Sequence, residues 1–141
     1  METPFTRVSL AVERTVKLDS MADLITQLGV MGLTASAQEQ LWVIALDSIN
    51  QIRGITIVSV GTYHDCFVSV PTILSPVLLS ATDRFIIAHN HPNGRSAPTD
   101  DDIDLTARVD AAAKVMDLSF DDHVIVSASG SWSSMRALGH L

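Results

Sequence analysis

The chain has 141 residues, of which 47% are hydrophobic, and a formal net charge of −7 at pH 7. This composition excludes a disordered chain, and no hydrophobic run approaches the roughly 20 residues that a membrane-spanning helix needs. The nine Lys and Arg residues are scattered, which argues against tight non-specific binding of nucleic acid. One cysteine, Cys66, excludes an internal disulfide and is typical of a reducing compartment. We expect one cytoplasmic domain over residues 1–141, without a signal peptide.

Hydrophobic patterns and capping residues predict strands interspersed with helices. The predicted strands cover residues 8–18, 41–46, 52–60, 85–88 and 120–127. The predicted helices cover residues 20–31, 71–80 and 100–116, with a short one at 133–138. The second and third strands should form a hairpin, and Pro76 should disturb the second helix. This order predicts an α/β or α+β fold with a central sheet.

Two histidines, His89 and His91, end the strand predicted before them. Residues i and i+2 of a strand point to the same face, so both imidazoles can reach one point. A carboxylate, Asp102, follows in a helix whose expected N-cap is Thr99. Two imidazoles, one carboxylate and a position for water are the ligand set of a catalytic zinc site. The sequence therefore predicts a metal site; the alternative is a polar loop in which the histidines make ordinary hydrogen bonds.

Three consecutive aspartates begin this helix, and each of them can stabilise its N-terminus by offsetting the helix dipole. The arrangement Thr99-x-x-Asp102 is typical of a capping box, which fixes the side chain at the third helical position. That position favours Asp102 as the metal ligand. We expect Asp100 and Asp101 to be solvated.

The sequence His-Asn-His-Pro at residues 89–92, followed by Thr99-x-x-Asp102, resembles the JAMM motif of the JAB/MPN metalloproteases. The asparagine between the histidines and the pair Asn93-Gly94 make it more similar to the RadC-like branch of that family. Asn93 and Thr99 stand where those chains usually have serine.

The resemblance implies the JAB/MPN fold, a cytidine-deaminase-like α/β fold whose central mixed sheet is flanked by helices. It implies one Zn²⁺ per chain, held by His89, His91 and Asp102. It also implies that Glu39, just before a predicted strand, is the general base; the alternative is an exposed glutamate where a strand begins. Thr99 would help to stabilise the tetrahedral intermediate, or it is purely an N-cap.

The pair Asp122-His123 also resembles RadC-like chains, and it is either structural or an outer partner of a metal ligand. Asp122 is the candidate for that second role. We expect His64 and His140 at the surface and Cys66 as a small packed side chain.

The family resemblance implies a JAMM-type zinc metalloprotease, a hydrolase of peptide or isopeptide bonds in a protein substrate. Eukaryotic relatives of this fold remove ubiquitin-like proteins from lysines, so a ubiquitin-like tail is a candidate partner, with its main chain near residues 94–98. The second hypothesis is a noncatalytic RadC-like accessory or scaffold linked to DNA repair or mobile elements. Longer RadC proteins often add a helix-hairpin-helix module, which we do not expect here. We expect weak nucleic-acid binding and no membrane partner, and the sequence leaves the oligomeric state open.

Overall fold

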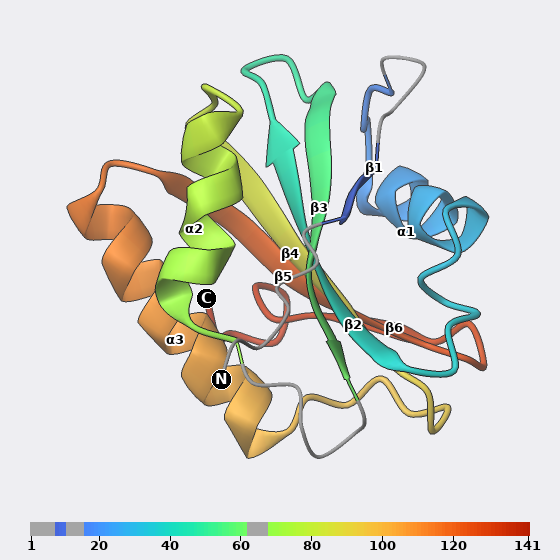
Figure 1. The fold of residues 1–141 in the computed structure, drawn as a ribbon. Coiled ribbons are helices and arrows are strands. Elements are labelled where there is room, and N and C mark those ends of the chain that lie inside the picture. Colours follow the sequence, from blue (N-terminus) through green and yellow to red (C-terminus); the bar gives the residue numbers. More distant parts are fainter. Residues whose placement is uncertain (1–7, 11–15, 62–67) are drawn as a thin grey trace, which may run out of the picture.

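The computed structural model describes residues 8–10, 16–61 and 68–141. The strands of these segments are β1 (Val8–Leu10), β2 (Glu39–Leu46), β3 (Ile52–Gly61), β4 (Arg84–His91), β5 (Ser119–Ser127) and β6 (Trp132–Ser134). The helices are α1 (Met21–Val30), α2 (Val70–Leu79) and α3 (Asp100–Val115). The sheet has the order β1-β3-β2-β4-β5-β6 (Figure 1). Only the β4–β5 pair among these is parallel, so the α/β fold with a mixed sheet is confirmed.

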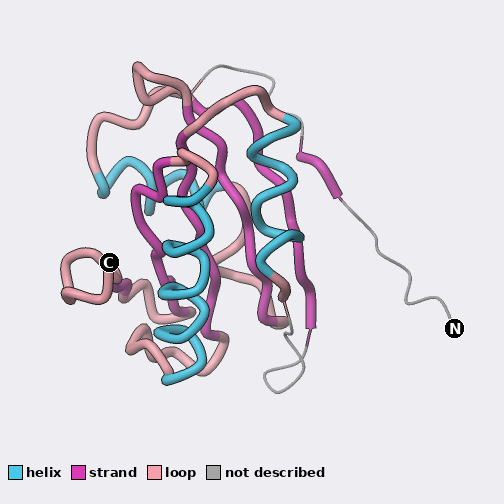
Figure 2. The backbone as a smooth tube through the Cα atoms, turned by 90° about the vertical axis from the view of Figure 1, so that its left-hand side faces the viewer, coloured by secondary structure: helices cyan, strands magenta, loops and turns pink. Residues whose placement is uncertain are grey.

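Helices cover both faces of the sheet. Trp42 and Ile44 belong to a hydrophobic cluster that packs against α1, whereas Leu41 belongs to one that packs against α2 and α3. Figure 2 shows α2 and α3 side by side over the same face. Because Leu41 pairs with His89 across the β2–β4 ladder, His89 and His91 project toward the face that α2 and α3 cover.

Helices α1 and α3 begin at the capping residues that the sequence indicates. At α1 the Ser20 hydroxyl accepts a hydrogen bond from Asp23 N. The Asp23 carboxylate accepts from Asp19 N, the residue before the N-cap, and not from Ser20 N as in a complete capping box. The box at α3 is complete, because Thr99 and Asp102 each accept a hydrogen bond from the other's main-chain N–H. This reciprocal pair fixes the Asp102 side chain as the sequence predicts.

The fourth predicted strand is longer in the structure than expected, and the first is described only in part. Val8–Leu10 pairs with β3 and Lys17 bridges Gln51, while residues 11–15 lie outside the described part, as do His64 and Cys66. The strand predicted at residues 85–88 continues to His91, because β4 pairs with β5 along its whole length. Both histidines therefore belong to the strand and not to a loop after it.

The helix predicted at residues 133–138 is wrong. The chain forms β6 there, followed by turns. The cause is the buried Asp122 carboxylate, which accepts hydrogen bonds from the Ser134 hydroxyl and from Arg136 N. Met135 N also donates to the His123 carbonyl, so this segment extends the sheet edge.

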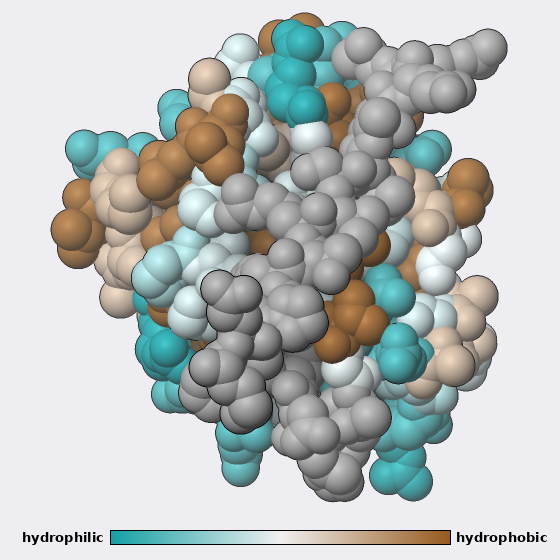
Figure 3. Space-filling view, in the orientation of Figure 1, coloured by the Kyte–Doolittle hydropathy of each residue, from teal (hydrophilic) through white to brown (hydrophobic). Residues whose placement is uncertain are grey.

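Exposed hydrophobic side chains gather at the C-terminal ends of α2 and α3 (Figure 3). They are Leu78, Leu79, Val115 and Met116. This end of α3 is the end opposite Asp102. Among the helices of the described segments, none has the length and apolar character that crossing a membrane requires.

Candidate metal centre

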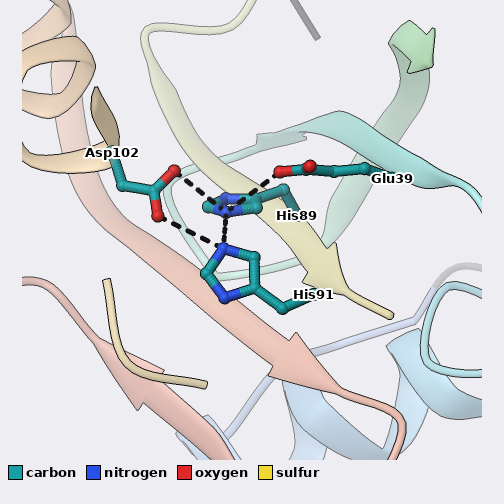
Figure 4. Close-up of side chains that lie close together, drawn as sticks. All are labelled: Glu39, His89, His91 and Asp102. Atoms are coloured by element: carbon teal, nitrogen blue, oxygen red, sulfur yellow. Dashed lines mark hydrogen bonds and ion pairs between the residues drawn. The ribbon is translucent and has the colours of Figure 1, made fainter. Parts of the chain in front are cut away.

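Four side chains that the sequence singles out meet at the carboxyl end of β4 (Figure 4). His89 and His91 come from β4, Glu39 from the first position of β2, and Asp102 from the first turn of α3. Their potential ligand atoms all lie within 4.8 Å of one another. Glu39 and both histidines are buried, and Asp102 is partly buried. The structure thus brings together the whole predicted ligand set and the predicted base.

The Asp102 carboxylate bridges the two imidazoles. Its Oδ1 lies 3.2 Å from His89 Nε2, and its Oδ2 lies 3.2 Å from His91 Nε2. The two Nε2 atoms are 2.9 Å apart. Glu39 stands further back, with Oε1 at 3.9 Å from His89 Nε2.

A chain of buried hydrogen bonds fixes the tautomer of His89. A carbonyl can only accept, so the Thr106 hydroxyl donates to the Asp102 carbonyl at 2.8 Å and accepts from His123 Nδ1 at 2.7 Å. Neutral His123 then has a lone pair on Nε2, which accepts from His89 Nδ1 at 2.7 Å. The hydrogen of His89 is therefore assigned to Nδ1, and its Nε2 turns a lone pair toward the cluster.

The loop after β4 fixes the tautomer of His91 in the same sense. His91 Nδ1 donates to the Arg95 carbonyl at 2.9 Å, which leaves a lone pair on Nε2. Arg95 is held in place because its N–H donates to the Asn93 side chain at 3.0 Å. Gly94 has φ +83°, a conformation that glycine adopts without strain. The Asn93 side chain thus stabilises the turn that orients His91.

These tautomers make the cluster a site for a cation. Both Nε2 atoms and both Asp102 oxygens are acceptors facing one another, an arrangement that a proton or a metal ion must compensate. Neighbouring ligand atoms around a tetrahedral zinc ion lie about 3.3 Å apart, close to the separations of 2.9 and 3.2 Å here. Each imidazole also has the outer hydrogen-bond acceptor that metal-bound histidines usually have. The residues present therefore fit a metal ion.

Electrostatics agree with this assignment. Burial opposes the charge of Asp102, but contact with the two histidines holds its pKa well below the usual range. Burial also opposes the charge of His91, yet the Asp102 carboxylate raises the pKa of His91. Complete burial lowers the pKa of His123, which keeps it neutral in the hydrogen-bonded chain. For Glu39, burial outweighs the attraction of the histidines and raises the pKa.

Two residues of this centre, Thr106 and His123, carry a role that the sequence did not reveal. The residue hydrogen-bonded behind the candidate ligand His89 is His123 and not the expected Asp122, because the β4–β5 register places His123 beside Ile87, on the face of the candidate ligands. Asp122 instead anchors the segment after β5. Asp100 and Asp101 are exposed, as expected.

A cleft of about 200 Å³ opens beside the cluster, between β2 and α3. Glu39, His89 and Asp102 line part of it. The described residues that line the rest are the hydrophobic Leu41, Val68 and Leu105 and the charged Asp101, Asp104 and Arg108. A substrate lying in this cleft would reach both the predicted ligands and the predicted base.

Known proteins are similar to this sequence over most of its length. Residues 18–140 match the model of the RadC-like JAB domain family. A UPF0758 protein of Trichodesmium erythraeum is 32% identical over 120 residues, covering 85% of this chain and 47% of the relative. A UPF0758 protein of Chloroflexus aurantiacus is 30% identical over 129 residues, covering 92% of this chain and 56% of the relative. A UPF0758 protein of Gloeothece citriformis is 36% identical over 104 residues, covering 74% of this chain and 42% of the relative.

The chain spans about half the length of the curated relatives it matches. Their names state no activity. The family match covers β2, β4, α3 and β5, the elements that carry the cluster. The chain belongs to the RadC-like JAB domain family.

Proposed function

We propose that this chain is a zinc-dependent hydrolase that cleaves peptide or isopeptide bonds. The observation that carries the proposal is the pair of lone-pair-bearing Nε2 atoms of His89 and His91, 2.9 Å apart and bridged by Asp102. Two neutral imidazoles and one carboxylate are a ligand set that zinc prefers in catalytic sites. Membership of a JAB domain family supports hydrolysis as the reaction class.

His89, His91 and Asp102 would hold the ion. When bound, zinc supplies Lewis acidity toward a carbonyl oxygen and toward water. Glu39 takes a proton from the attacking water and returns it to the leaving amine as the C–N bond breaks. Its position 3.9 Å from His89 Nε2 and its raised pKa suit this exchange of a proton. Thr99 Oγ1 accepts a hydrogen bond from Asp102 N, and the hydroxyl hydrogen of Thr99 remains available to donate to a substrate oxygen.

We propose a protein substrate, with the Gly-ended tail of a ubiquitin-like protein as the candidate, because a tail without side chains can lie close to the metal. The cleft beside Leu41 and Leu105 is a better place for it than the loop at residues 94–98. That loop is tied to the chain itself: the carbonyls of Gly94 and Ser96 accept hydrogen bonds from Ser129 and Ser133. The reducing environment that one cysteine suggests favours a cytoplasmic site of action.

The test compares zinc content and hydrolysis in four proteins: the wild type and three variants. Glu39→Gln should keep its zinc and lose about 10²–10⁴-fold in kcat, because only the proton carrier is changed. Asp102→Asn should lose zinc and activity together. Asp100→Asn is the matched control, since it removes a neighbouring exposed carboxylate of the same helix turn that does not line the cleft, and it should retain both. Substrates are a ubiquitin-like fusion cleaved after Gly, and casein as an unstructured comparison.

Zinc loss in Glu39→Gln would make Glu39 a ligand and not the base. Zinc binding without hydrolysis of any peptide or isopeptide substrate by the wild type would contradict the enzyme and favour the accessory role. Digestion of casein without cleavage of the fusion would retain the peptidase but reject the ubiquitin-like substrate.

A further inference from the structure

The asparagine between the two histidines lies on the other face of β4. Alternate residues of a strand face opposite sides, so Asn90 projects toward the α1 side while His89 and His91 project toward α3. Asn90 is completely buried. A buried amide is costly unless its polar atoms are hydrogen-bonded, so its partners indicate what it holds.

Within the described part of the chain, the hydrogen bonds of the Asn90 side chain all go to the main chain just before β2 and at its start. Oδ1 accepts from Gln40 N at 2.7 Å. Nδ2 donates to the Gln38 carbonyl at 3.0 Å and to the Ser36 carbonyl at 3.2 Å. Gln38 and Gln40 are the residues on either side of Glu39. One side chain therefore fixes the main chain both before and after the proposed base.

These bonds continue the sheet where its ladder stops. The described β2–β4 register ends at the pair Leu41–His89. One residue further along, the Gln40 N–H reaches the Asn90 side chain instead of the main chain of β4. Asn90 thus sets the spacing between the start of β2 and the strand that carries the histidines. The Glu39 carboxylate, on the opposite face, lies 3.9 Å from His89 Nε2 at that spacing.

We propose that Asn90 is the positioning residue for Glu39. In this arrangement β4 presents the proposed metal ligands on one face, and Asn90, on its other face, fixes the main chain that carries the proposed base. The inference rests on the proposed function of Glu39. A displacement of about 1 Å in a reacting group can cost about 10²-fold in rate. Loss of the Asn90 hydrogen bonds should therefore affect the proton transfer far more than it affects metal binding.

The decisive variant is Asn90→Asp, which keeps the shape and an acceptor for Gln40 N but loses the amide donor to two carbonyls. Asn90→Ala also loses the acceptor, so it is the secondary variant. Both variants leave the Ser36 and Gln38 carbonyls without a donor, so thermal unfolding first establishes that each is folded. Gln40→Glu is the matched control. It also replaces an amide in this region, removing the bond from Gln40 Nε2 to Ser36 Oγ, but it leaves Gln40 N bonded to Asn90.

Asn90→Asp should lower kcat about 10²-fold with KM and zinc content close to those of the wild type, whereas Gln40→Glu should keep its kcat. In a Glu39→Gln background, Asn90→Asp should cause no further loss, because residues that act through one step are not additive. Independently of activity, amide hydrogen exchange across residues 36–42 should accelerate in Asn90→Asp and not in Gln40→Glu. A crystal structure of Asn90→Asp should show the Glu39 carboxylate moved away from His89.

Three results would overturn the proposal: zinc loss in Asn90→Asp like that of Asp102→Asn, a rate loss that adds fully to that of Glu39→Gln, or a Glu39 carboxylate that stays in place in the variant structure. If the wild type hydrolyses nothing, the proposed function fails. The positioning of Glu39 is then decided by hydrogen exchange and by the variant structure.

Discussion

Asp102 faces one nitrogen of the His89 ring directly and reaches the other through the side chains of His123 and Thr106. The Asp102 carboxylate lies 3.2 Å from Nε2, and the Asp102 carbonyl terminates the chain of Thr106 and His123 that reaches Nδ1. Both connections begin at the first turn of α3. The orientation of the ring and the position of its carboxylate partner therefore change together if the helix moves.

Thr106→Val should weaken metal binding by about 10–100-fold, the usual effect of losing an outer partner of a metal ligand. Valine has nearly the same shape, but it cannot accept the His123 Nδ1 hydrogen, so His123 no longer fixes the His89 tautomer. Competition with a chelator measures the affinity.

Thr82→Val is the matched control, because the buried Thr82 hydroxyl has no hydrogen-bond partner among the residues that the structure describes. That control should bind metal normally and unfold at the same or a higher temperature. Unchanged affinity in Thr106→Val would exclude the tautomer role.

Substitutions of Thr99 separate its capping role from a role in catalysis. Thr99→Ala should destabilise the protein by about 1 kcal/mol, whereas Thr99→Gly should cost only a few tenths, because glycine is tolerated at an N-cap. Both lack the hydroxyl. Equal losses of kcat in the two variants would support a donor to substrate, while losses that follow the unfolding temperature would make Thr99 a cap alone. Thr99→Ser should retain both properties.

Metal affinity should fall as the pH decreases, starting above the ordinary imidazole pKa of 6.5. In the metal-free chain, the Asp102 carboxylate outweighs burial and raises the pKa of His91, so a proton competes for Nε2 as the pH falls through that raised value. Asp102, whose pKa is lowered, stays charged throughout this range. Chelator competition at several pH values tests this. An affinity that is constant from about pH 8 to about pH 6 would contradict it.

Binding to DNA should be no tighter than about micromolar at physiological salt, because phosphate neutralisation by basic residues supplies most non-specific affinity. The chain has nine Lys and Arg against sixteen Asp and Glu. A gel-shift titration with a salt series measures it. A nanomolar complex with a steep salt dependence would favour the accessory role in DNA repair over the peptidase.

The sequence predicted the parts of the centre that depend on short-range geometry. The same-face position of His89 and His91 follows from strand periodicity, and the placement of Asp102 follows from the capping box with Thr99. Glu39 was assigned only through the family resemblance, because its approach to His89 depends on the pairing of β2 with β4, in which Leu41 pairs with His89, a residue far along the sequence.

The sequence favoured Asp122 over His123 as the outer partner of a ligand, and the structure reverses that choice. Strand periodicity shows that adjacent residues face opposite sides, but it does not show which side faces the ligands. The parallel register of β4 with β5, which pairs Ile87 with His123, makes that choice. The helix expected at residues 133–138 failed for a related reason, since the tie from Ser134 to Asp122 exists only in the folded sheet.

The sheet order also imposes an order of assembly during synthesis. The β2–β3 hairpin is local and can form early, whereas the β4–β5 pair is parallel and must wait until α3 has been made and has crossed over the sheet. Every direct ligand candidate has left the ribosome once residue 102 has emerged, but the His123 that fixes the His89 tautomer follows about twenty residues later. A nascent chain therefore carries all four clustered side chains before the residue that fixes the His89 tautomer, and the centre is complete only when β5 has formed.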